Sequence, residues 1–82
     1  MSLPELVLSL SRSADVVART AESENVAPAL ASIGMVTETI VPALIRELVP
    51  IAKKQRISRR RCALLLAVPE SAIADIYAAA RR

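Results

Sequence analysis

Histidine, tryptophan and phenylalanine are absent from this sequence, and cysteine, tyrosine and glycine each occur once. Without histidine, the chain lacks both the usual acid–base side chain at neutral pH and the commonest metal ligand. A single cysteine forms neither an intrachain disulfide nor a zinc cluster. One glycine cannot build a phosphate-binding loop, and one aromatic side chain cannot stack a run of single-stranded bases. The composition therefore predicts a protein that is not an enzyme and that uses no cofactor and no metal.

The apolar content is high for so short a chain. Of the 82 residues, 54% are apolar, and this length is enough for one domain with a modest core. Small domains bury a lower fraction of their surface than large ones, and many gain stability by oligomerising. We therefore expect part of the apolar surface to be shared with a partner or with a second copy of the chain.

The sequence gives little sign of secretion or of a membrane span. The first ten residues contain Glu5 and no basic side chain, which is not the pattern of a signal peptide. The longest charge-free run, Asn25 to Thr37, is shorter than the roughly 18 residues of a spanning helix. Val26 to Ile45 has the required length only by including Glu38, whose charge is costly inside a bilayer. We expect a cytoplasmic protein that has no membrane partner.

Charge divides the chain into two parts. Residues 1–50 carry a net charge of −3, whereas residues 51–82 carry a net charge of +6. This asymmetry suggests two roles on one chain. We predict a single domain, 1–82, in which residues 1–50 form a helical core and oligomerisation part and residues 51–82 form a basic part.

Apolar periodicity predicts an all-α fold, a small bundle of four to five short helices. The expected helices lie near residues 3–22, 27–41, 43–54, 59–67 and 70–80. Ser2 is the expected N-cap of the first helix, with Glu5 three residues later, and Ser58 is a plausible cap of the fourth. Pro42 and Pro50 each remove a backbone donor, so residues 26–55 are expected to be one kinked helix or several pieces.

The first predicted helix carries an apolar seam with alternating spacings of four and three residues. Its members are Leu3, Val7, Leu10, Ala14 and Val17. Such a seam packs either against the rest of its own domain or against a second copy of the same helix. The second interpretation predicts a homodimer.

The segment Ser58 to Tyr77 resembles a helix-turn-helix. A small residue, Ala63, stands where the two helices cross, and Ala67 stands at the tight turn four residues later, followed by Val68. The second helix of the motif buries two apolar residues three apart, which Ile73 and Ile76 match. Families of this kind usually have glycine at the position of Ala67, because the turn tends to need a positive φ. The resemblance implies a fold that ends in a helix-turn-helix and binds DNA.

Basic residues gather at the start of this segment. The expected phosphate contacts are Lys53, Lys54, Arg56, Arg59, Arg60 and Arg61. Such a cluster binds duplex DNA strongly but carries little sequence information. The expected base contacts are Ser71 and Ala72, whereas Glu70 and Asp75 on the same helix would repel phosphates. By this placement Cys62 and Leu66 are core residues.

Two functions remain open from these residues. The first is a small transcriptional regulator that binds double-stranded DNA through its C-terminal part, as a homodimer. The second is a small helical regulator, similar in size to phage or plasmid accessory proteins, that binds and modulates another protein. In the second case Ile73, Ile76 and Tyr77 would lie near a contact of the helix-in-groove type.

Overall fold

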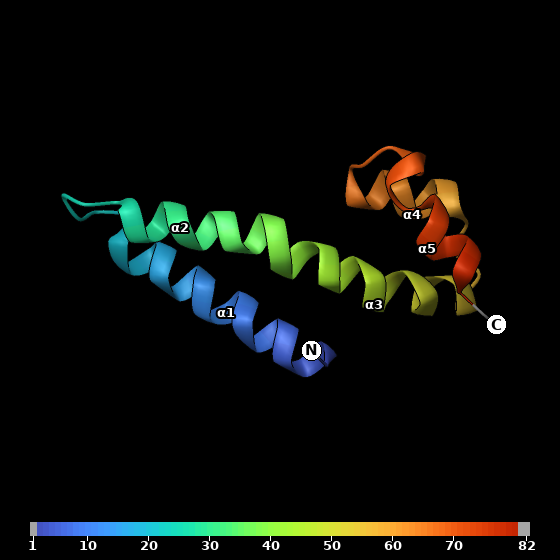
Figure 1. The fold of residues 1–82 in the computed structure, drawn as a ribbon, viewed down its shortest axis with the longest axis horizontal. Coiled ribbons are helices and arrows are strands. Elements are labelled where there is room, and N and C mark those ends of the chain that lie inside the picture. Colours follow the sequence, from blue (N-terminus) through green and yellow to red (C-terminus); the bar gives the residue numbers. More distant parts are fainter. Residues whose placement is uncertain (1, 81–82) are drawn as a thin grey trace. The chain divides into compact units, whose positions relative to one another are not determined.

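A computed structural model describes residues 2–80, and all regular structure among them is helical (Figure 1). This confirms the predicted all-α class. The elements, in chain order, are α1 (Leu3–Thr20), α2 (Ala27–Met35), the π-helical segment η1 (Val36–Ile40), α3 (Val41–Lys54), α4 (Arg59–Leu66), the 3-10 turn η2 (Glu70–Ala72) and α5 (Ala74–Ala79). The chain forms two compact units, residues 1–44 and residues 45–82, which are described separately below. The division predicted between residues 50 and 51 falls inside α3.

Helix α1 begins with the predicted capping box. The hydroxyl of Ser2 accepts from the Glu5 backbone N–H and donates to the Glu5 carboxylate at 2.8 Å, which also accepts from the Ser2 backbone N–H. These bonds to Ser2 hold the pKa of Glu5 below its ordinary value. Because the ionised carboxylate makes the better acceptor, the cap favours folding at neutral pH. That contribution is lost as the pH falls through the pKa of folded Glu5.

The first unit is a hairpin of α1 and α2 (Figure 1). Helix α1 ends at Thr20 rather than near residue 22, and the Asn25 side-chain oxygen then accepts from the Ala27 backbone N–H at 3.0 Å to start α2. The side of α1 that faces inward carries buried Leu6 and Ser13. Ala29 is the buried residue of α2. Small side chains at the contact allow two helices to approach closely.

The predicted seam of α1 is not the face that packs within the chain. Val7, Leu10 and Ala14 are exposed, and Leu3 and Val17 are half-buried. The inward face is rotated about the helix axis from the predicted seam by about one residue step, which corresponds to roughly 100°. The interpretation in which this seam packs on its own domain is therefore wrong for most of its length, while packing against a second copy stays a prediction.

The middle of the chain is one continuous helix, Ala27–Lys54. Of the two alternatives for residues 26–55, one helix or several pieces, the structure has one helix, so the segments expected near 27–41 and 43–54 are joined. Proline removes an N–H and crowds the carbonyl four residues earlier. Here η1 lies directly before Pro42, and the Val41 N–H bonds to the Val36 carbonyl, five residues back. A π turn of this kind inserts extra room into the helix, so the helix passes Pro42 without ending. Pro50 also lies inside α3, which continues to Lys54.

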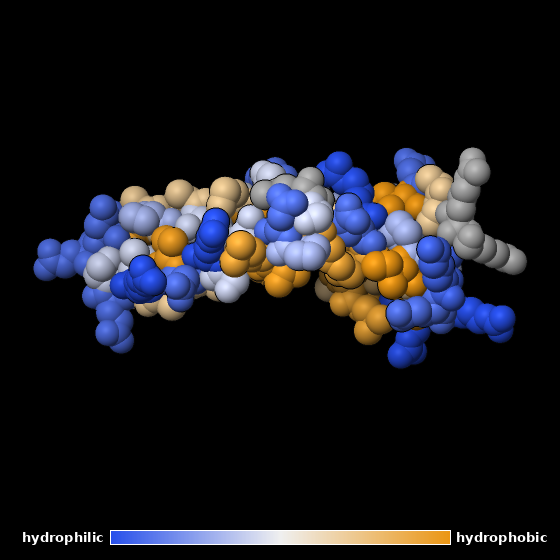
Figure 2. All heavy atoms as spheres, turned by 90° about the horizontal axis from the view of Figure 1, so that it is seen from below, coloured by the Kyte–Doolittle hydropathy of each residue, from blue (hydrophilic) through white to orange (hydrophobic). Residues whose placement is uncertain are grey.

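Among residues 2–80, Ala27–Lys54 is the one helix that is long and apolar enough to cross a membrane. Only 11% of its most apolar stretch is buried. By composition alone, such a helix is also suited to packing against another protein surface. Apolar side chains reach the surface in both units (Figure 2).

The second unit has a core built from three helical segments. Val49 of α3, Cys62 and Ala63 of α4, and Ile73 form its buried cluster. Half-buried apolar side chains surround this cluster, namely Ile45, Ala52, Ile57, Val68, Ile76 and Tyr77. The packing of α3 against this cluster accounts for the persistence of the helix beyond Pro50, because tertiary contacts outweigh one lost hydrogen bond.

The last predicted helix, 70–80, is wrong in form. The segment begins as the 3-10 turn η2, and Ile73 then has φ −119° and ψ 0°, which interrupts the helix before α5. Ile73 is almost completely buried, so its side chain fixes the backbone there. The α-helical part is only six residues long.

Candidate nucleic-acid interface

The turn after α4 has the backbone conformation that the sequence motif requires. Ala67 adopts φ 57° and ψ 42°, in the left-handed region. Its N–H bonds to the Leu64 carbonyl at 3.2 Å, and the Val68 N–H bonds to the Ala63 carbonyl at 3.0 Å. A left-handed residue at a helix end is usually glycine, so alanine here costs roughly 1 kcal/mol.

The residues that the motif assigns to the helix crossing lie together. Ala63 and Ile73 are 3% and 1% exposed and belong to one buried cluster, against which Ile76 packs half-buried. Cys62 is also buried in this cluster, as predicted, whereas Leu66 is 38% exposed, so its prediction as a core residue is wrong. The joint burial predicted for Ala63, Ile73 and Ile76 is confirmed for Ala63 and Ile73 and is wrong for Ile76, which is half-buried at the edge of the cluster.

Five of the six predicted phosphate contacts are exposed. They are Lys54, Arg56, Arg59, Arg60 and Arg61. Lys54 and Arg56, together with Lys53, Ser58 and Tyr77, line an open polar hollow of about 720 Å³. The Ser58 hydroxyl accepts from the Arg61 backbone N–H at 3.1 Å, which caps α4 as predicted and fixes the start of the helix that carries the three arginines.

Lys53 is engaged inside the unit. Its ammonium group donates to the backbone carbonyls of Tyr77 at 3.0 Å and Ala80 at 2.9 Å, and it lies 5.1 Å from the centre of the Tyr77 ring. Both carbonyls lie at the C-terminal end of α5, where a cation is favoured by the helix dipole. The Tyr77 hydroxyl donates to the Ile57 carbonyl at 2.7 Å, which ties α5 to the segment between α3 and α4.

Lys53→Met is therefore expected to destabilise the second unit by about 2 kcal/mol, because it removes charged hydrogen bonds and keeps the apolar stem. Urea denaturation followed by circular dichroism measures this change. Lys54→Met is the matched control, since Lys54 is exposed and makes no side-chain bond to any residue that the structure describes. Equal stability of the two variants would contradict the stabilising role assigned to the hydrogen bonds of Lys53.

The predicted base contacts lie on η2. Ser71 and Ala72 are both exposed. The neighbouring Glu70 carboxylate forms an ion pair with Arg59 at 3.4 Å, with both side chains about half exposed. This pairing offsets part of the negative charge beside Ser71, whereas Asp75 on α5 is exposed and has no ion pair among the described residues.

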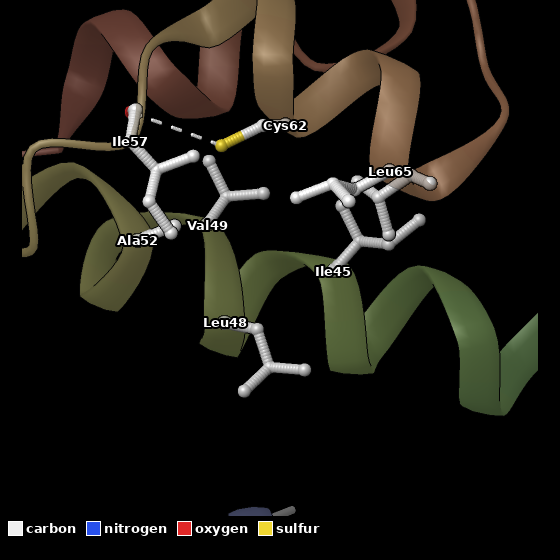
Figure 3. Close-up of a pocket in the computed structure, with 8 residues that line it drawn as sticks. Ile45, Leu48, Val49, Ala52, Ile57, Cys62 and Leu65 are labelled. Atoms are coloured by element: carbon white, nitrogen blue, oxygen red, sulfur yellow. Dashed lines mark hydrogen bonds between the residues drawn. The ribbon is translucent and has the colours of Figure 1, made fainter.

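An apolar hollow of about 160 Å³ lies between α3 and α4 (Figure 3). Ile45 and Leu65 approach each other across it, and Val49 lies beside Cys62, whose Sγ is 3.9 Å from the Ile57 carbonyl oxygen (Figure 3). This hollow was not predicted from the sequence. The sequence feature that indicates it is the run of three leucines at the end of α4. Consecutive residues of a helix point in different directions, so these three leucines cannot all face inward.

The contact residues predicted for a protein partner differ in their exposure. Ile73 is buried, and Ile76 and Tyr77 pack half-buried against the core. The large apolar side chains exposed in this unit are instead Leu64 and Leu65 of α4, at 72% and 68%, with Leu48, Ile51 and Leu66 less exposed. The leucines of α4 are therefore more accessible to a partner than the side chains of the core.

No protein-family model, curated protein or solved structure matches this chain. Within residues 2–80, no group of three or more metal-ligating side chains lies close enough together to hold a metal ion.

Proposed function

We propose that the protein is a small transcriptional regulator that binds double-stranded DNA through residues 45–82. The observation that carries this proposal is the exposure of five basic residues close together in the sequence, Lys54, Arg56, Arg59, Arg60 and Arg61, of which Lys54 and Arg56 line an open polar hollow. Guanidinium and ammonium groups on one small unit neutralise phosphates and release the counterions condensed on DNA. Arginine also binds phosphate with two parallel hydrogen bonds, which fixes the orientation of the protein on the duplex.

The helix-turn-helix assignment belongs to this proposal. It is supported by the left-handed Ala67 turn and by the burial of Ala63 with Ile73. In such a motif the second helix approaches the major groove, which here gives Ser71 and Ala72 the base contacts. Neither side chain makes a bidentate bond to a base, so the proposal assigns most of the affinity to phosphate contacts and only weak sequence preference to η2.

Titration of the wild-type protein with random-sequence duplex DNA tests the proposal. Five phosphate contacts give a slope of about −4.5 in the logarithm of affinity against the logarithm of salt concentration. Between about 50 mM and about 200 mM salt, affinity should therefore fall roughly 500-fold. Fluorescence anisotropy measures both values. No binding to any duplex at the lower salt concentration would refute the proposal.

A regulator that binds another protein is the second candidate, and the exposure of Leu64 and Leu65 favours it. Arg60 and Arg61 precede these leucines on the same helix. The combination suits an amphipathic helix whose apolar side chains are flanked by acidic ones. The same titration separates the candidates, because this one predicts a folded protein that binds no duplex.

A further inference from the structure

The hairpin of α1 and α2 leaves most of its large apolar side chains uncovered. Within residues 2–44, the buried residues are Leu6, Ser13, Ala29 and Ile40, and two of these are small. Val7, Leu8, Leu10, Val26, Leu30, Ile33, Met35 and Val41 are all exposed. Four buried side chains are a very small core for a unit of this length, because small domains already bury a low fraction of their surface.

The exposed apolar residues are concentrated on one side of the hairpin. Leu10, Ala14 and Val17 of α1 line a hollow of about 300 Å³ together with Ser13 and with Ile33, Val36 and Thr37. Leu30 precedes Ile33 by three residues and so lies on the same stripe. We call this surface the hairpin face, made of Leu3, Val7, Leu10, Ala14, Val17, Leu30, Ile33, Val36 and Thr37.

The opposite side of the hairpin is more polar. A hollow there is lined by Ser9, Arg12, Ser13, Val16, Ser32 and Met35. The charged residues of α1, namely Glu5, Arg12, Asp15 and Arg19, all lie off the hairpin face. The hairpin as a whole is therefore amphipathic, although each of its helices already packs against the other.

We propose that the hairpin face is the binding surface for a second copy of this chain, and that two hairpins form a four-helix bundle. A two-fold axis brings the same surface of each copy together, so a charged face would repel itself. The hairpin face carries no charged side chain, and it satisfies this condition. Packing of the two faces would enclose Leu10 and Ile33 between four helices, as in other bundles of this type.

The dimensions of the face suit a dimer. Helix α1 has 18 residues and is therefore about 27 Å long, and two helices side by side are about 20 Å wide. Two such faces in contact cover roughly 1,000 Å² in total, which is about the minimum area expected of a biological interface.

The charge of the first unit favours a second copy over a lipid surface. Residues 1–44 contain five acidic and two basic side chains, a net charge of −3. Anionic lipids would repel this unit, since juxtamembrane segments that bind them are basic. The inference is independent of DNA binding, which is assigned to residues 45–82.

Ile33→Glu tests the inference, with Met35→Glu as the matched control. Both residues lie on α2 and are 50% exposed, but Ile33 belongs to the hairpin face and Met35 lines the opposite hollow. Light scattering should give wild type and Met35→Glu a mass twice the 8.8 kDa of one chain, and Ile33→Glu the mass of a single chain. A wild-type protein of single-chain mass at tens of micromolar, or an Ile33→Glu dimer, would overturn the inference.

A second measurement covers the case in which Ile33→Glu fails to fold. The melting temperature of a wild-type dimer rises with protein concentration, whereas that of a monomer does not. Co-sedimentation with neutral and with anionic lipid vesicles provides the remaining comparison. A wild-type protein that sediments with either and melts independently of its concentration would have a lipid surface, and not a second copy, on its hairpin face.

Discussion

Ala63→Arg is expected to unfold the second unit, with a loss of about 4 kcal/mol or more in its free energy of unfolding. Ala63 is 3% exposed and packs with Val49, Cys62 and Ile73. Arginine at this position overpacks the cluster, which costs about 1–3 kcal/mol, and buries an unpaired charge, which costs several more. A core of this size supplies only about 3–5 kcal/mol, so the variant should lose its cooperative transition. Urea denaturation followed by circular dichroism measures the loss.

Leu64→Arg is the control for this substitution. Leu64 is the next residue of α4 and is 72% exposed, so an arginine there remains in solvent. Its effect on stability should stay within about 0.5 kcal/mol of wild type. If the Ala63 variant denatured at the same urea concentration as the Leu64 variant, the packing described for α4 would be incorrect.

Replacement of Arg60 and Arg61 by alanine is expected to lower the affinity for all duplex sequences alike, by roughly 100-fold in total. Both side chains are exposed and make no hydrogen bond to any residue that the structure describes, so their removal should leave the fold intact. Two fewer phosphate contacts should also make the salt slope about 1.8 units shallower. Anisotropy titrations at several salt concentrations measure both effects.

Arg12→Ala with Arg19→Ala is the charge-matched control, because it removes two positive charges from exposed positions in the first unit. This double variant should bind duplex DNA with nearly the wild-type affinity. The small difference expected comes from long-range electrostatic attraction, which salt screens. Ser71→Ala should change the preference between duplex sequences more than the total affinity, because Ser71 is assigned a base contact. Equal losses in the two arginine pairs would mean that net charge, and not the basic cluster of the second unit, drives binding.

The sequence was sufficient for features that depend on neighbouring residues. Three local patterns are found as expected: the capping box of Ser2 and Glu5, the N-cap at Ser58, and the turn at Ala67. Their physical basis is a hydrogen bond or a backbone angle within a few residues, which a sequence displays directly.

Features that depend on distant residues were not predictable in this way. Helix α1 has two neighbouring faces with suitable spacing, and the one that packs inward contains Ser13 rather than the predicted Leu10. Hydrophobic periodicity favours the face with larger apolar residues, whereas close approach of α2 requires small ones. The role of Lys53 was missed for a similar reason, because the carbonyls it binds lie 24 and 27 residues further along the chain.

The fold of this chain could be stabilised by substitutions at its glycine and at its left-handed residues. Arg56 and Ala67 end their helices at φ 61° and 57°, where glycine would be free of strain. The one glycine, Gly34, lies instead within the long helix, where an added Cβ would meet no atom within 4 Å. Each of these three residues lowers the free energy of unfolding by roughly 1 kcal/mol, which is a large share of the stability of a small protein. A single substitution at Ala67 or Gly34 could therefore compensate for a destabilising change elsewhere in the chain without altering a proposed binding residue.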